Sequence, residues 1–174
     1  MPRQRSRAVP VIDLFAGPGG LGEGFSAFRP TNGRQAFKIR LSIERDPTAH
    51  ETLRLRSFYR QFEPEAVPDA YYDVLRGKTS VESLFGAHPA QAKAARRESW
   101  RGTLGLILRS VLNGRINNAL GGSERWVLIG GPPCQAYSVA GRSRNNGNKN
   151  YKADDDHRRH HRCDARPAVR GDVD

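Results

Sequence analysis

Apolar and polar positions along the first part of the chain predict two strands joined by a glycine-rich turn and a helix. Val9–Phe15 is short and mostly apolar, as expected for a buried parallel strand. From Phe37 to Ile43 every second residue is apolar, which predicts a half-buried strand that closes at Glu44. Between them lies the turn AGPGGLGEG, followed by residues with helical spacing. The apolar face of that helix is expected at Leu21, Phe25 and Phe28.

The rest of the readable pattern is helical, with one more strand. Asp46 and Pro47 suit the N-cap and first position of a helix that runs to about Phe62. Residues 63–101 are broken by prolines and glycines and predict an irregular segment, apart from a short exposed helix over Gln91–Glu98. A second amphipathic helix ends at glycines 121 and 122, and Trp126–Ile129 follows as a buried strand. The apolar stripe of that helix is expected at Leu104, Ile107, Leu108, Val111 and Leu112.

Strands that alternate with helices predict an α/β fold with a mostly parallel sheet and right-handed crossovers. In such sheets ligands bind beyond the carboxyl ends of the strands. Three features fall there: the glycine turn, Glu44 and the Pro-Pro-Cys sequence of residues 132–134. We therefore expect three loops to converge on one edge of the sheet.

Composition and charge narrow the class of protein. The 174 residues suit one domain or part of one, and a net charge of +11 favours polyanionic partners, nucleic acid first. A solvated arginine-rich surface is the alternative interpretation of the same charge. Two cysteines, Cys134 and Cys163, are too few for a disulfide framework. With no signal peptide and no apolar run of about 20 residues, the sequence predicts a cytoplasmic protein.

The glycine turn and Glu44 predict a cofactor site. Gly17, Gly19 and Gly22 match G-x-G-x-x-G between a strand and a helix, and Glu44 ends the next strand, where a carboxylate can accept hydrogen bonds from ribose hydroxyls. NAD, FAD and S-adenosylmethionine all fit, and an ordinary tight turn beside a surface glutamate is the alternative. Pro18 lacks the N–H that a pyrophosphate would need, so a cofactor without phosphates suits the turn better.

Cys134 is a candidate nucleophile. Pro132 and Pro133 stiffen the chain before it, and Arg142 and Arg144 would favour its thiolate if they lie near. A buried structural cysteine is the alternative. Metal binding is not expected, because Cys134 has no C-x-x-C partner.

Three sequence blocks carry a family resemblance. IDLFAGPGGLGEGF, IERD and IGGPPCQAYSVAGR closely resemble conserved blocks of the DNA cytosine-5 methyltransferases, over about residues 9–158. The resemblance implies a Rossmann-like fold that uses S-adenosylmethionine, with the segment of residues 63–122 longer than in minimal members. It also implies that the thiolate of Cys134 adds to C6 of a cytosine flipped out of double-stranded DNA, as in a restriction–modification or solitary methyltransferase.

The resemblance assigns further residues to the site. Arg45 stands where relatives pack a side chain, often aromatic, against adenine. The implied cofactor contacts are Phe15, Ala16, Gly17, Gly19, Gly20, Glu44, Arg45 and Pro133. The implied DNA contacts are Gln135, Ser138, Arg142 and Arg144.

The sequence also departs from the family. No Glu-Asn-Val block, which carries an acid for cytosine N3, occurs in the chain, and the later arginine block and target-reading domain are absent. We expect a basic leader at residues 1–8, the N-terminal part of a catalytic domain at 9–158, and a disordered tail unlike the family at 159–174. The methyltransferase fold is thus expected to be incomplete at its C-terminus. Our hypothesis for such a tail is a shift of the reading frame near residue 158.

These departures leave three functions open. The first is a truncated methyltransferase with little or no turnover, unless a second polypeptide supplies the missing half. The second is an NAD(P)-dependent oxidoreductase, which explains the glycines and Glu44 but not the sequence around Cys134. The third is a non-catalytic DNA-binding fragment that acts through charge.

Overall fold

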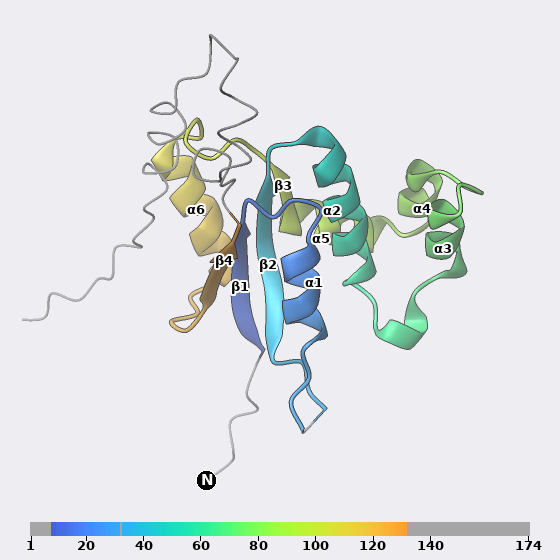
Figure 1. Ribbon diagram of the computed structural model, residues 1–174, viewed down its shortest axis with the longest axis horizontal. Helices are drawn as coiled ribbons and strands as arrows, with labels where there is room; N and C mark the ends of the chain where they lie inside the picture. The colour runs from blue at the N-terminus through green and yellow to red at the C-terminus, as the bar shows by residue number, and fades with distance from the viewer. Residues whose placement is uncertain (1–7, 32, 132–174) are drawn as a thin grey trace, which may run out of the picture.

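A computed structural model of the protein describes residues 8–31 and 33–131, which form one parallel sheet with helices on both faces (Figure 1). The strands lie in the order β3-β2-β1-β4, and each pairs in parallel with its neighbours. This confirms the predicted α/β class and is consistent with a Rossmann-like methyltransferase fold. The strands are β1 (Val9–Leu14), β2 (Phe37–Glu44), β3 (Ser99–Arg101) and β4 (Val127–Gly130).

Six α-helices and one short 3-10 helix connect these strands in the described residues. Their bounds are α1 (Gly20–Ala27), α2 (Pro47–Tyr59), η1 (Pro64–Ala66), α3 (Asp69–Leu75), α4 (Val81–Ala87), α5 (Pro89–Glu98) and α6 (Arg109–Leu120). Helices α1, α2 and α5 lie on one side of the sheet and α6 on the other (Figure 1). None of the helices in this part of the chain is long and apolar enough to cross a membrane.

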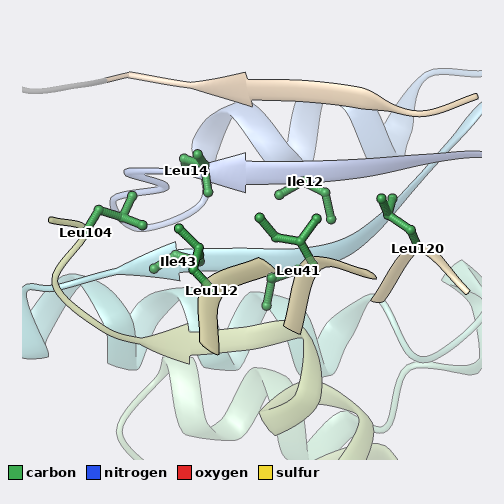
Figure 2. Close-up of a cluster of buried hydrophobic side chains, with 8 residues drawn as sticks. Ile12, Leu14, Leu41, Ile43, Leu104, Leu112 and Leu120 are labelled. Atoms are coloured by element: carbon green, nitrogen blue, oxygen red, sulfur yellow. The ribbon is translucent and has the colours of Figure 1, made fainter. Parts of the chain in front are cut away.

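The main core lies between α6 and the sheet (Figure 2). Ile12 and Leu14 of β1 and Leu41 and Ile43 of β2 point to the same face, because side chains two apart in a strand share a face. The side chains that cover them are Leu104, Leu112, Ile116 and Leu120. Burial of this face fixes the register of β1 and β2, which places their carboxyl ends at one edge of the sheet.

A second core joins α2 to the helices that follow it. Phe58 is fully buried and its ring contacts those of Phe62 and Phe85, with centroids 5.1 and 4.9 Å apart. The ring of Tyr71 in α3 packs at a tilt against that of Tyr59 in α2, and Ala92 and Ala95 of α5 are buried in the same cluster. The segment predicted to be irregular is therefore largely helical. The predicted short helix over Gln91–Glu98 is present within α5, but it is partly buried rather than exposed.

The predicted apolar face of α1 is wrong at Leu21 and Phe28, whereas Phe25 is half-buried, with its ring centroid 5.1 Å from that of Phe37. Leu21 and Phe28 are 48% and 54% exposed, whereas Gly22 and Ser26 are buried. A Cβ at Gly22 would lie 3.3 Å from Oδ2 of Asp13. The absence of a side chain therefore lets α1 approach the sheet along its glycine-bearing face, which an apolar pattern does not reveal.

The predicted stripe of the later helix is also displaced. Helix α6 begins at Arg109, so Leu104 is buried from the preceding loop, while Leu108 and Val111 are 71% and 51% exposed. The N–H groups of Leu106 and Ile107 both bond to the carbonyl of Thr103, forming a turn before the helix begins. The helix ends as predicted, with Gly121 at a φ of 57°.

Three smaller differences concern helix and strand bounds. Helix α2 ends at Tyr59 rather than near Phe62, and the three-residue strand β3 was not predicted. Strand β4 is present, but it was predicted to be buried and Leu128 is 47% exposed. Among the described strands β4 lies at one end of the sheet and pairs only with β1, which explains this exposure.

Candidate cofactor site

The turn after β1 is fixed to the end of β2 by backbone hydrogen bonds. The N–H of Ala16 donates to the carbonyl of Ile43 at 3.0 Å, and the N–H of Gly19 donates to the carbonyl of Ala16 at 2.9 Å. Phe15 has a φ of 57°, which is uncommon for a residue with a side chain. Gly17 and Gly19 also have positive φ, a conformation that glycine adopts without strain. The glycines therefore satisfy the backbone requirement of the turn, as predicted from the sequence.

Glu44 joins this turn to the loop after β2. Its Oε2 accepts a hydrogen bond from the N–H of Gly17 at 2.8 Å. Its Oε1 accepts two more, from the N–H groups of Arg45 at 2.8 Å and Asp46 at 2.7 Å. A carboxylate has about four lone-pair positions, so Glu44 retains one for a further donor such as a ribose hydroxyl.

The glycine turn is packed on one side and open on the other. A Cβ on Gly19 would lie 2.9 Å from Cδ1 of Leu53, and Arg56 donates from Nη1 to the carbonyl of Pro18 at 3.1 Å, so α2 supports the turn. A Cβ on Gly17 would meet nothing within 4 Å. A ligand can therefore approach the main chain at Gly17, next to the Glu44 carboxylate.

The turn offers few hydrogen-bond donors to a phosphate. The N–H of Gly17 is bonded to Glu44, that of Gly19 to Ala16, and Pro18 has none. Residues 17–19 thus present no free N–H, whereas dinucleotide sites place the pyrophosphate against such donors. The residues fit S-adenosylmethionine, which has hydroxyl groups but no phosphate, better than they fit NAD or FAD.

Asp13 lies beneath the site, and the predicted site residues did not include it. It is fully buried in β1, next to Ser42 in the register of the sheet, and neither carboxylate oxygen has a hydrogen-bond partner in the described residues. Burial raises the pKa of the Asp13 carboxyl to about 6; Arg60 lowers it and Glu44 raises it further. An aspartate within the apolar sequence VPVIDL is the signal from which this buried acid could have been predicted.

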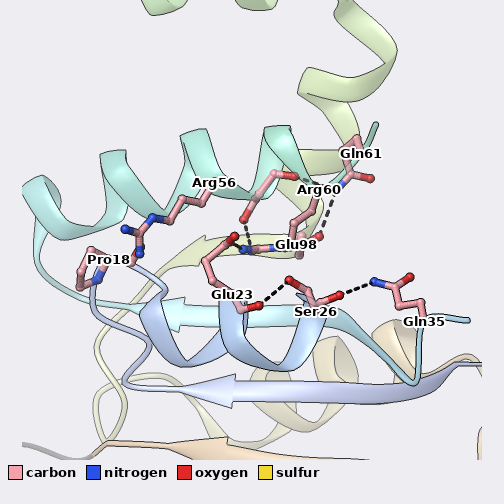
Figure 3. A network of polar contacts seen from close by, with 9 residues as sticks. Pro18, Glu23, Ser26, Gln35, Arg56, Arg60, Gln61 and Glu98 are labelled. Atoms are coloured by element: carbon pink, nitrogen blue, oxygen red, sulfur yellow. Dashed lines mark hydrogen bonds and ion pairs between the residues drawn. The ribbon is translucent and has the colours of Figure 1, made fainter. Parts of the chain in front are cut away.

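A buried ionic network holds α1 against the neighbouring helices (Figure 3). Arg60, at the end of α2, bonds to Glu23 of α1 and to Glu98 of α5. The side chains of Arg60 and Glu98 are only 8% and 7% exposed, and Gln61 also donates to Glu98, at 3.0 Å. Because α1 follows the glycine turn, this network also limits movement of the turn.

The remaining predicted residues divide into those the structure describes and those it does not. Arg45 is exposed after β2, and Gly20 begins α1 beside the turn. Gly130, the last residue of β4, pairs with Leu14, so the end of β4 lies beside the beginning of the turn. The other predicted site residues lie outside the described residues: Pro133, Cys134, Gln135, Ser138, Arg142 and Arg144.

Comparison with known proteins gives one informative similarity. The chain is 31% identical over 151 residues to the type II methyltransferase M.Bpa9945I of Bacillus paralicheniformis. The match includes 77% of this chain and 32% of that protein, so the chain spans about a third of the length of its relative. No protein-family model and no solved structure matches. The chain is therefore a distant homologue of a type II methyltransferase.

Proposed function

We propose that the chain carries the cofactor site and the nucleophile of a DNA cytosine-5 methyltransferase of a restriction–modification system. The observation that carries the proposal is the hydrogen bond between Glu44 and Gly17 beside an open glycine turn. The homology to a type II methyltransferase and the resemblance of the sequence around Cys134 support it. Because the chain spans only part of its relative, the activity of the whole protein is included in the proposal.

In this proposal Glu44 accepts a hydrogen bond from the ribose of S-adenosylmethionine, and Phe15, Ala16, Gly17, Gly19 and Gly20 line the rest of the pocket. The face of the turn at Gly17 gives the ligand access to the main chain. Arg45 and Pro133 complete the pocket. When bound, S-adenosylmethionine supplies a methyl group on a sulfonium centre, which a carbon nucleophile can take.

Cys134 makes the cytosine nucleophilic. Its thiolate adds to C6, the C5–C6 π bond breaks, and the electron pair is left in the ring with carbanion character at C5. Once C5 has taken the methyl group, which would leave a neutral thioether on the donor, a base accepts the C5 proton. The C5–C6 double bond then re-forms and the C6–S bond breaks, which releases the thiolate. The target base must be flipped out of the duplex, with Gln135, Ser138, Arg142 and Arg144 contacting the DNA.

The position of β4 supports the pairing of nucleophile and cofactor. Gly130 lies beside Leu14, at the beginning of the glycine turn, and Cys134 follows Gly131 by three residues. Three residues extend the chain by at most about 11 Å. In this proposal the thiol acts at the edge of the sheet where Glu44 lies.

Covalent trapping tests this function. The chain, together with a second polypeptide that supplies the Glu-Asn-Val block and the target-reading domain, is incubated with S-adenosylmethionine and a duplex in which 5-fluorocytosine replaces cytosine, so that fluorine occupies the position of the departing proton. A protein–DNA adduct that resists denaturation is expected from this complemented chain and from its Cys163→Ser variant, but not from its Cys134→Ser variant. Absence of an adduct from the complemented chain, or its persistence in Cys134→Ser, would overturn the proposal.

A further inference from the structure

A basic groove runs along the β3 side of the sheet, between β2, α5 and α6. It has a volume of about 930 Å³ and extends from Ser110 in the first turn of α6 to Ala119 near the end of the helix. It also borders Lys38–Leu41, the N-terminal part of β2, which precedes the residues that pair with β3. The groove thus leads away from the carboxyl edge where the cofactor site lies.

The charges that line this groove are almost all positive. Its cations are Lys38 and Arg40 of β2, Arg97 of α5 and Arg115 of α6. Its one acid, Glu98, is already bound by Arg60 and Gln61. The groove therefore has an excess of positive charge that the described residues do not neutralise.

Arg115 is held in place by an aromatic ring. Its guanidinium lies over the ring of Trp100, 4.5 Å from the centroid, which fixes the plane of the group and leaves its N–H edge available. Burial lowers the pKa of the Arg115 guanidinium, and no neighbouring acid opposes that effect. A partly buried cation without a counter-charge is stabilised when an anion binds beside it.

Length and charge together point to a chain of phosphates. The segment of α6 from Ser110 to Ala119 extends about 14 Å at the helical rise of roughly 1.5 Å per residue. One strand of B-DNA carries a phosphate about every 3.4 Å along its axis, or about four in that length. Four cations lie along the groove.

We propose that this groove binds the phosphate backbone of double-stranded DNA outside the target base, as a second contact surface distinct from the cofactor edge. The inference rests on the proposed function, because that function makes DNA the partner. Contacts to phosphates carry no base specificity, so the groove would contribute affinity and orientation for any flanking sequence.

The salt dependence of DNA binding tests the groove. Binding of the full chain to a 30-base-pair duplex of arbitrary sequence is followed by fluorescence anisotropy at several salt concentrations. The test variant is Lys38→Gln/Arg97→Gln, since both side chains are exposed and their loss threatens no buried contact. The matched control is Lys93→Gln/Arg96→Gln, which removes two exposed cations from α5 that do not line the groove.

Each lost phosphate contact reduces the slope of log K against log salt by about 0.9, which corresponds to roughly an eight-fold loss of affinity in 0.1 M salt. In the test variant, which loses two contacts, the slope should therefore become less steep by about 1.8. The control variant should change the slope little. Equal changes in both variants, or none in the test variant, would overturn the proposal. Equal weakening of poly-glutamate binding in the test variant would also overturn it, because the groove would then not select phosphate.

The two proposals fail separately. Cys134→Ser removes the covalent adduct but should leave the salt slope unchanged, because the substitution removes no positive charge from the groove. If no adduct forms but the Lys38→Gln/Arg97→Gln variant still reduces the salt dependence of DNA binding, only the methyl-transfer chemistry is overturned. If the adduct forms normally but the salt dependence of DNA binding does not change when Lys38 and Arg97 are replaced, only the proposal that the groove binds DNA is overturned.

Discussion

Glu44 accepts a hydrogen bond from the N–H of Gly17, a residue 27 positions earlier in the chain. The same carboxylate accepts two bonds from the loop that follows it. It therefore holds the ends of two neighbouring strands in a fixed relation before any ligand binds. Such preorganisation reduces the ordering that binding would otherwise require.

Replacement of Glu44 by glutamine should weaken binding of S-adenosylmethionine by at least about ten-fold. Both carboxylate oxygens of Glu44 accept hydrogen bonds, whereas the glutamine amide has a single acceptor oxygen and no charge. A hydrogen bond to a charged group contributes roughly 1.5–3 kcal/mol to the free energy of binding. Isothermal titration calorimetry measures the effect. Glu51→Gln, at an exposed site in α2, is the matched control and should bind as the native chain does. Equal affinities in the two variants would contradict the role given to Glu44.

Substitution of Gly17 by alanine should separate cofactor binding from folding. The Cβ meets no atom of the protein within 4 Å, so the direct cost is that of a side chain at positive φ, about 1 kcal/mol. The same methyl group would occupy the open face of the turn and weaken S-adenosylmethionine binding much more.

Gly24→Ala is the control for that substitution. Gly24 lies within α1, where alanine favours the helix, and a Cβ there meets nothing within 4 Å. The variant should raise the free energy of unfolding by about 0.5–1 kcal/mol without changing cofactor affinity. Thermal unfolding and calorimetry on both variants check the pair, and an unchanged affinity in Gly17→Ala would show that the ligand does not lie against this turn.

Loss of Arg60 should destabilise the fold strongly. Arg60→Met leaves Glu98 buried without its cation, a change that costs roughly 3–5 kcal/mol when one partner of a buried pair is removed. Urea unfolding measures the loss. Arg76→Ala breaks an exposed ion pair with Asp73 and should cost less than about 1 kcal/mol. Similar losses in the two variants would mean that the network around Arg60 contributes no more than a surface pair.

Asp13 should make stability depend on pH between about 4 and 6. Its folded-state pKa is raised, so the native state holds the proton more tightly than the unfolded state, and stability falls as pH rises through this range. The full effect corresponds to roughly 3 kcal/mol for a shift of about two pKa units. Asp13→Asn removes this contribution.

The measurement is the difference in unfolding free energy between Asp13→Asn and the native chain. As pH rises from 4 to 7, Asp13→Asn should become more stable relative to the native chain. The exposed control Asp69→Asn should show no comparable trend. A difference that is constant with pH would mean that Asp13 finds a partner that keeps its carboxylate charged.

Local signals in the sequence were sufficient for much of the fold and for the glycine turn of the candidate cofactor site. Asp46 is the N-cap of α2, its side chain accepting from the N–H of Ala49 at 2.8 Å, because the signal for that cap lies within four residues. The glycine turn and Glu44 were also predicted, since each depends on residues adjacent in the chain. That the two meet follows from parallel pairing of β1 and β2.

The errors arose where packing between distant elements decides the outcome. Gly22 is buried because it lies against Asp13, and the exposure of Leu21 follows from that contact. Likewise, β3 has only three residues, and it lies beside β2 through parallel pairing and a further hydrogen bond from the N–H of Gly102 to the backbone carbonyl of Glu44. The network of Glu23, Arg60 and Glu98 joins residues up to 38 positions apart, and no local pattern identifies such partners.

Gly130 is the last residue of β4, and a Cβ there would overlap the carbonyl oxygen of Leu14. Any other amino acid would have to push β4 away from β1 just before the segment that leads to Cys134. Under the proposed function, the absence of a side chain at Gly130 would set the spacing between the methyl donor and the thiol. A larger residue at this one position would then be expected to move the two proposed reacting groups apart while leaving every chemical group in place.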